Sequence, residues 1–166
     1  MSPKGSAGAA GPFLVFDIGR EEQGGGSFAL EVSRVFQVIE PSMVSVVPLA
    51  PPVVLGILNH HGRIITVIDP APLLELPPQD GPVLQAVVLR QGAKGPNNLG
   101  LKVARIQGIV ARADLSEVDV ESRPGVAWVA RAGRRLVHIV ATEPLLERLS
   151  RLFGSLERSS VQGVTV

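Results

Sequence analysis

The chain has 166 residues, of which 45% are hydrophobic and 19% are charged, and its formal net charge is +1. This balance disfavours nucleic acid as the main partner, because nucleic-acid-binding proteins usually present a strongly basic face. The sequence contains no cysteine, which excludes disulfides and thiolate metal sites. Its apolar runs are too short to span a bilayer, and the Gly/Ala/Ser-rich start lacks a secretory signal, so we expect a cytoplasmic location.

Composition also indicates how the chain is divided. Residues 1–12 are predicted to form a disordered N-terminal tail, and residues 154–166 a flexible C-terminal tail. Between them, residues 13–153 are predicted to form one domain. Its two halves cover approximately residues 13–76 and 83–153, and the proline-rich segment 77–82 is the best internal boundary.

The first elements in chain order are predicted strands at residues 13–18 and 28–31, separated by a glycine-rich polar loop. Apolar residues between 32 and 39 recur at a helical spacing, which allows a short helix, whereas their β-branched character favours a strand. Residues 44–47 are predicted to form a further strand that ends at Pro48.

A central hairpin is predicted over residues 56–69, because two apolar runs flank a short polar turn that ends in Gly62. Residues 63–69 carry apolar side chains on both alternating faces, which is typical of a strand buried on both sides. Asp69 can cap a short helix that begins at Pro70, and Leu73, Leu74 and Leu76 would dock that turn.

The second half of the chain is again predicted to consist of short strands joined by turns. Strands are predicted at residues 83–89, at 99–104 with half-buried alternation, and at 106–110 with a bulge or a sharp bend at Gly108. A polar loop at residues 114–123 and a second hairpin at residues 126–140 follow. A helix over residues 142–156, with Thr142 as its cap, presents a leucine stripe that we expect to pack on the core; binding of a partner by this stripe is the alternative.

About ten short strands broken by turns predict a mainly all-β fold, either paired small barrels or a sandwich. The strands do not alternate with helices, and a doubly wound α/β fold is therefore disfavoured.

The order and spacing of several segments resemble the CheW-like domain family of bacterial chemotaxis. The strongest part is Gly56-Ile57-Leu58-Asn59-His60-His61-Gly62 with the strand that ends at Asp69, which is similar to the family pattern G-[VI]-x-N-x-R-G. Residues 13–16, 28–38 and 136–146 support the resemblance. It implies two intertwined five-stranded SH3-like β-barrels with a shared core, short helices and a C-terminal helix.

The same resemblance implies a non-enzymatic adaptor that couples chemoreceptor cytoplasmic tips to the regulatory domain of a CheA-type histidine kinase. It implies no cofactor, and association with membrane-proximal receptor arrays only through these partners. The positions that would line the receptor groove are Val35, Val38, Gly56, Asn59 and His61.

The sequence departs from the family pattern at His61, where the family has arginine, at Pro70, where it usually has leucine, and at Ala104, where it has aspartate. A degenerate CheW-like scaffold, or a generic SH3-like protein-interaction module with weak or no receptor coupling, is therefore the alternative hypothesis.

The residues support a catalytic or metal site less well than they support a protein-binding role. His60 and His61 are adjacent on a turn and are expected to point in different directions, and His138 has no suitable spacing to complete a metal site. His61 is expected either to contact a partner or to be merely solvated. Asp69 is interpreted as a helix cap in place of a catalytic carboxylate. An enzyme or small-ligand-binding protein would require ionisable groups that converge in a pocket.

Overall fold

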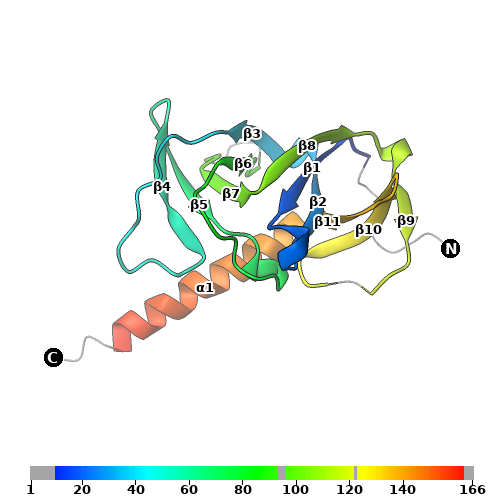
Figure 1. The fold of residues 1–166 in the computed structure, drawn as a ribbon. Helices are drawn as coiled ribbons and strands as arrows, with labels where there is room; N and C mark the ends of the chain where they lie inside the picture. Colours follow the sequence, from blue (N-terminus) through cyan, green and yellow to red (C-terminus); the bar gives the residue numbers. More distant parts are fainter. Residues whose placement is uncertain (1–9, 93–95, 122, 163–166) are drawn as a thin grey trace.

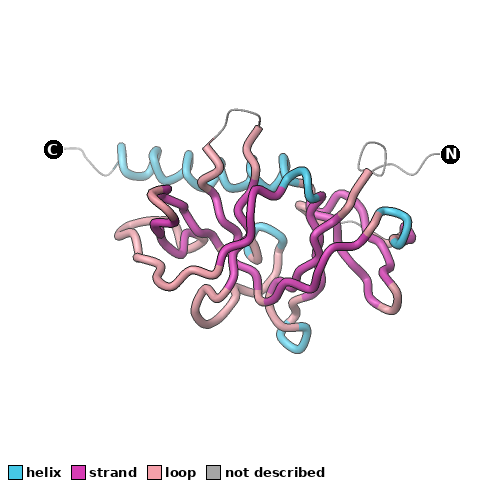
Figure 2. The backbone as a smooth tube through the Cα atoms, turned by 90° about the horizontal axis from the view of Figure 1, so that it is seen from above, coloured by secondary structure: helices cyan, strands magenta, loops and turns pink. Residues whose placement is uncertain are grey.

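A computed structural model describes residues 10–92, 96–121 and 123–162, with side chains as far as Gly154. Residues 1–9 of the predicted N-terminal tail and residues 163–166 of the predicted C-terminal tail therefore lie outside the described residues. Within the described part of the chain the strands form two sheets that lie side by side, with one long helix along them (Figures 1 and 2).

Sheet A contains six strands in the spatial order β8-β1-β2-β11-β10-β9. Their bounds are β1 (Phe13–Ile18), β2 (Gly26–Glu31), β8 (Arg105–Val110), β9 (Ser116–Val118), β10 (Val126–Ala132) and β11 (Arg135–Val140). Sheet B contains five strands in the order β3-β6-β7-β5-β4. Their bounds are β3 (Val35–Ile39), β4 (Val54–His60), β5 (Arg63–Ile68), β6 (Gln85–Leu89) and β7 (Leu99–Val103).

Each sheet combines strands from both sides of the segment 77–82. In sheet A the two parts are joined by the antiparallel pairing of β1 with β8 and the parallel pairing of β2 with β11. In sheet B they are joined by the antiparallel pairing of β3 with β6 and the parallel pairing of β5 with β7. This confirms the predicted all-β, intertwined fold. It differs in detail, since sheet A has six strands and, among the described residues, the hydrogen-bonded ladder closes in neither sheet.

The core has three parts. The largest cluster lies between the sheets and contains the fully buried Phe16, Leu74 and Leu101 among its members. A second cluster consists mostly of side chains on the strands of sheet A. In it the rings of Phe13 and Trp128 pack edge-on, with centroids 5.9 Å apart. A third cluster, which includes Ile65 and Val67, consists of side chains on the strands of sheet B. Aliphatic side chains thus make most of the core, as the composition predicts.

Both predicted hairpins and the bulge at Gly108 are confirmed. The register between β1 and β8 shifts between the pairs that flank this bulge, Val15↔Gly108 and Phe16↔Ile106. Of the two alternatives for residues 32–39, the strand is right. A short 3-10 turn, η2 (Val32–Arg34), precedes β3.

The strand predicted at residues 44–47 is wrong. A single bridge forms there, in which Ser45 exchanges both backbone hydrogen bonds with Ile57 at 2.8 Å. Pro48 cannot donate to a ladder, and Leu49 has a φ of 62°, so the chain turns away after Ser45. The connection between β3 and β4 is therefore a long surface loop.

Burial along two strands also differs from expectation. The prediction that β5 is covered on both faces is wrong at its start, because Ile64 is 54% exposed where it follows the turn. The half-buried alternation predicted for β7 is wrong as well. All five of its residues are buried, and they include Lys102. A lysine is rarely buried without partners, so this position needs a specific explanation.

The C-terminal helix α1 (Thr142–Gln162) is longer than predicted and continues into residues assigned to the tail. It starts directly after β11 and runs along one side of sheet B (Figure 2). Leu145 and Leu149 are buried, as the core-packing interpretation of the stripe predicts, whereas Phe153 is 41% exposed. No helix of the described residues is long and apolar enough to cross a membrane.

Candidate protein-binding site

The turn between β4 and β5 is held by its own polar groups. His61 and Gly62 both have positive φ, 51° and 78°, as the two central residues of a type I′ hairpin turn do. The side-chain Oδ1 of Asn59 accepts a hydrogen bond from the Gly62 N–H at 2.9 Å. The rings of His60 and His61 contact each other with centroids 4.4 Å apart, so the expectation that they point in different directions is wrong.

Gly56 lies beneath the β3–β4 connection and is buried. A Cβ at this position would lie 2.3 Å from the Ser45 carbonyl oxygen and 2.7 Å from a Val44 methyl group, and the φ of Gly56 is +153°. Only glycine fits such a close backbone approach. Gly56 therefore shapes the surface by holding residues 44 and 45 against β4, and exposes little of itself.

Val35 and Val38 lie on β3, which the sheet order places at the opposite edge of sheet B from β4. Val35 packs against the main core, whereas Val38 is 39% exposed. The guanidinium of Arg63, just after the turn, lies 4.7 Å from the centre of the Phe36 ring on β3. This contact shows that sheet B curls and brings the start of β5 close to the edge strand β3.

The five predicted groove positions thus divide into two groups. Val38, Asn59 and His61 present exposed or partly exposed side chains on the edges of sheet B. Val35 and Gly56 lie deeper and support this surface from within.

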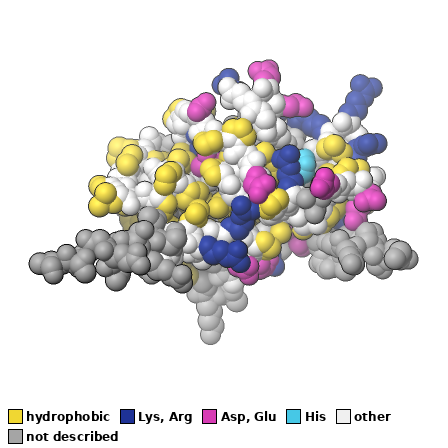
Figure 3. Space-filling view, turned by 90° about the horizontal axis from the view of Figure 1, so that it is seen from below, with side chains coloured by type: hydrophobic (Ala, Val, Ile, Leu, Met, Phe, Trp, Pro, Cys, Tyr) yellow, Lys and Arg dark blue, Asp and Glu magenta, His cyan; other side chains and the backbone are white. Residues whose placement is uncertain are grey.

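An exposed apolar stretch next to this surface was missed by the sequence analysis. Met43, Val46 and Leu49 in the β3–β4 connection are 74%, 81% and 100% exposed, respectively. Hydrophobic side chains gather over the sheet B end of the molecule in the view from below (Figure 3). Large exposed apolar patches mark interaction surfaces, and the usable signal was a run of apolar residues broken by prolines.

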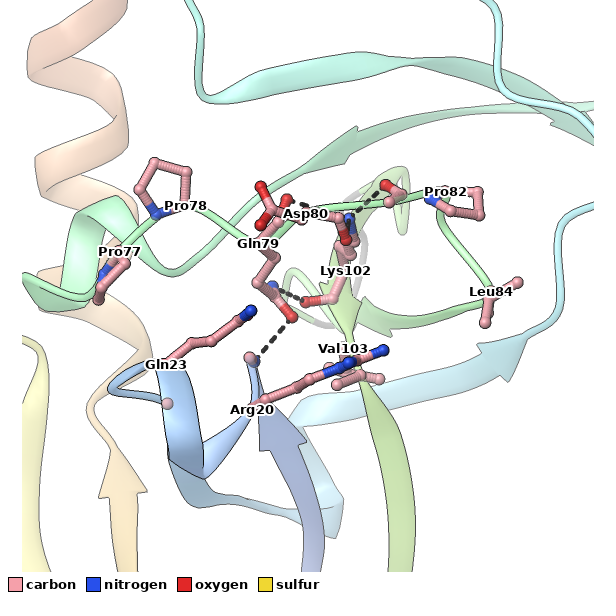
Figure 4. Close-up of a pocket in the computed structure, with 14 residues that line it drawn as sticks. Arg20, Gln23, Pro77, Pro78, Gln79, Asp80, Pro82, Leu84, Lys102 and Val103 are labelled. Carbon is pink, nitrogen blue, oxygen red and sulfur yellow. Dashed lines mark hydrogen bonds between the residues drawn. The ribbon is translucent and has the colours of Figure 1, made fainter.

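A second feature that the sequence analysis missed is a cavity of about 410 Å³ at the junction of the sheets (Figure 4). The buried Nζ of Lys102 donates hydrogen bonds to the carbonyl oxygens of Gln79, Asp80 and Gly81 at 3.2, 3.0 and 2.8 Å. These three bonds use every N–H of the ammonium group. Burial lowers the pKa of Lys102, and the carboxylates of Asp69 and Asp80 oppose that shift.

Gln79 completes this network. Its backbone N–H and its side-chain amide donate to the two carboxylate oxygens of Asp69 at 2.8 Å, and the amide also donates to the Lys102 carbonyl at 2.9 Å. Its Oε1 accepts from the Gly19 N–H at the end of β1 at 3.0 Å. The segment 77–82 is therefore fastened to both sheets.

Asp69 is not the predicted cap of the helical turn, because the N-cap of that turn is Ala71 and no side chain caps it. The Asp69 Oδ1 instead accepts a hydrogen bond from the Ala71 N–H at 3.0 Å, just before the turn begins. The helical turn that follows, η3 (Pro72–Leu74), is a short 3-10 turn. With their hydrogen-bonding groups already engaged, Asp69 and Lys102 serve the structure of the junction and do not form a reactive pair.

Two curled sheets with exchanged strands, and an exposed hairpin turn beside apolar side chains, define an all-β domain of the SH3-like type with a surface suited to protein binding. The family model of the CheW-like domain matches residues 12–150. The chain belongs to the CheW-like domain family.

Among solved structures, the scaffolding protein CheW from Thermoanaerobacter tengcongensis is similar, with a TM-score of 0.60 and 17% sequence identity. The match covers 78% of this chain and 89% of that protein. At this level of identity the likeness shows the fold. The comparison with curated proteins gave no match.

Proposed function

We propose that the chain is a non-enzymatic adaptor of a bacterial chemosensory array. In this role it binds the cytoplasmic tip of a chemoreceptor and the regulatory domain of a CheA-type histidine kinase. The observation that carries the proposal is the match of the CheW-like domain over residues 12–150. The protein would act in the cytoplasm and reach the membrane-proximal array through these partners.

The surface of sheet B supports the proposal. Val38, Asn59 and His61 are candidates for direct contact with the receptor tip. Val35 and Gly56 would act indirectly, because they hold β3 and the β3–β4 connection in place. The scaffold of the turn depends on Asn59 and Gly62, and both fit its backbone geometry.

The test is co-sedimentation of the full chain with receptor-tip fragments and with the CheA-type kinase of the same cell. Val38→Asp should reduce recovery with the receptor fragment about tenfold, since a carboxylate is placed in an apolar contact. Val120→Asp is the matched control, because Val120 is similarly exposed at 44% and lies in the loop after β9. Binding of neither partner at micromolar concentration would refute the adaptor proposal.

A scaffold that couples receptors weakly is the second candidate, and His61 is the observation that favours it. The residue stands where the family pattern has arginine. Its backbone is in the left-handed conformation, and its ring contacts the His60 ring. His61→Arg should then increase recovery with the receptor fragment, whereas His60→Arg on the same turn should not. If both variants match the unmodified protein, His61 does not limit coupling.

A further inference from the structure

A second surface lies at the end of sheet A where β2, β8 and β11 begin and β1 ends. A cavity of about 670 Å³ opens there, lined by side chains that include Arg20, Arg105, Arg134 and Arg135. It shares Gly19, Arg20, Gly25 and Ala104 with the junction cavity of about 410 Å³. The two cavities therefore adjoin each other, and together they are called the trough.

The part of the trough on sheet A carries excess positive charge. Four arginines line it, against the carboxylates of Asp17 and Glu21. Asp17 is already engaged, since it accepts hydrogen bonds from Ser27 Oγ and Gln107 Nε2 and lies 3.5 Å from Arg105 Nε.

The other arginines are available. Within the described residues, Arg20, Arg134 and Arg135 make no ion pair with a carboxylate. Arg134 and Arg135 are exposed at the start of β11, and Arg20 extends along the edge of the junction cavity beside Val103 (Figure 4). In the view from below, basic and acidic side chains lie interspersed over this half of the molecule (Figure 3).

The other end of the trough has a different character. Its walls include Pro77, Pro78, Pro82, Leu84 and Val103, and Leu84 is 65% exposed. Lys102 contributes no free donor there, because its ammonium group is occupied by three backbone carbonyls. The trough therefore has a basic end on sheet A and an end on the segment 77–82 where these apolar side chains lie beside the polar Gln23, Gln79 and Asp80.

We propose that this trough binds an extended segment of a partner protein that carries acidic side chains followed by apolar ones. The guanidinium groups of Arg20, Arg134 and Arg135 would pair with the carboxylates, a geometry that arginine favours. The apolar side chains would pack on the prolines and Leu84. This surface lies on sheet A and the segment 77–82, and it is separate from the sheet B surface proposed for the receptor.

The observations favour a polypeptide over a phosphate group or an anionic membrane. A compact phosphate site gathers several donors on one point, whereas these arginines are distributed along the trough. Asp17 at the basic end would repel a dense dianion, and separate carboxylates on a chain can avoid it. A flat membrane surface would leave the recessed apolar end unfilled.

The experiment measures fluorescence anisotropy of a fluorescein-labelled peptide with four glutamates followed by Leu-Pro-Val-Leu, titrated with the full chain. A peptide with glutamines in place of the glutamates is the ligand control. Vesicles of phosphatidylcholine with phosphatidylserine, and inorganic phosphate, test the other anions as competitors.

The double variant Arg134→Glu/Arg135→Glu should weaken binding of the acidic peptide about tenfold or more, because attraction becomes repulsion. Arg131→Glu/Arg151→Glu makes the same change of net charge at exposed positions outside the trough, and should change the affinity less than about twofold. Leu84→Asp should weaken binding through the apolar end. Thermal melts of all variants check that they are folded.

Three results would overturn the proposal. The first is equal affinity for the glutamate and glutamine peptides, and the second is an equal loss of peptide affinity in the two double variants. The third is binding of the vesicles or of phosphate without binding of the peptide. Loss of peptide binding that is confined to the trough variants supports it, whatever the outcome of the receptor experiment.

Discussion

Replacement of Lys102 by methionine tests the polar network at the junction of the sheets. Methionine keeps the apolar stem and most of the volume of the side chain and removes only the ammonium group. The carbonyl oxygens of Gln79, Asp80 and Gly81 then lose their shared donor. The segment 77–82 would remain fastened only through Gln79 and its contacts with Asp69 and Gly19.

The expected loss can be worked out from these contacts. A buried acceptor left without a donor costs about 1–3 kcal/mol. The open cavity lets water reach the three carbonyls, so the lower figure applies to each, or about 3 kcal/mol together. Removal of a buried charge whose pKa is lowered by burial offsets part of this, which leaves about 2 kcal/mol. For a domain of this size, that corresponds to a decrease in Tm of about 4–8 °C.

Urea denaturation followed by circular dichroism gives the free energy of unfolding, with Arg151→Met as a control for loss of an exposed cation. Gln79→Ala combined with Lys102→Met should cost less than the sum of the single changes, since both belong to one network. A loss for Lys102→Met within about 0.5 kcal/mol of the control would refute the reasoning, as would strict additivity with Gln79→Ala.

Three further predictions concern packing and pH. Gly56→Ala should lower the free energy of unfolding by about 2 kcal/mol or more, because its Cβ would overlap the Ser45 carbonyl; Gly154→Ala, which meets open space, is the control. Leu145→Ala should cost about 2–5 kcal/mol in urea denaturation and Phe153→Ala much less, since Leu145 is 1% exposed and Phe153 is 41% exposed; equal losses would contradict this. Burial lowers the pKa of His138 below its ordinary value of 6.5, so the folded state resists a proton that the unfolded chain accepts. Stability should therefore fall as the pH drops through 6.5 towards the lowered pKa, and His138→Gln should reduce this fall, as unfolding at about pH 7.5 and pH 5.5 will measure.

The hairpins were predictable because their signals are local. Gly62 and Gly133 lie in short turns between apolar runs, and the structure places two-residue turns at residues 61–62 and 133–134. The resemblance to the CheW-like family then predicted how the strands combine. This part could not come from periodicity, since the parallel pairings join strands that are far apart in the chain.

The errors arise where distant segments decide the environment. Lys102 alternates with Leu101 and Val103 as an exposed residue would, and it is buried because the segment 77–82 folds over it. Residues 44–47 resemble a strand in composition, but only Ser45 finds a partner. The trough was not predictable, because its arginines come from three separate connections that meet only in the folded chain.

The arrangement of the two sheets along the chain has a consequence for synthesis. All five strands of sheet B lie within one continuous stretch, from Val35 to Val103, so they can pair as soon as that stretch has left the ribosome. The β1–β2 hairpin emerges first but gains its neighbours β8 and β11 only when residues 105–140 have been made. The first strands of the chain therefore wait longest for their partners, with the apolar face of Phe13 and Val15 uncovered until the end of sheet A arrives.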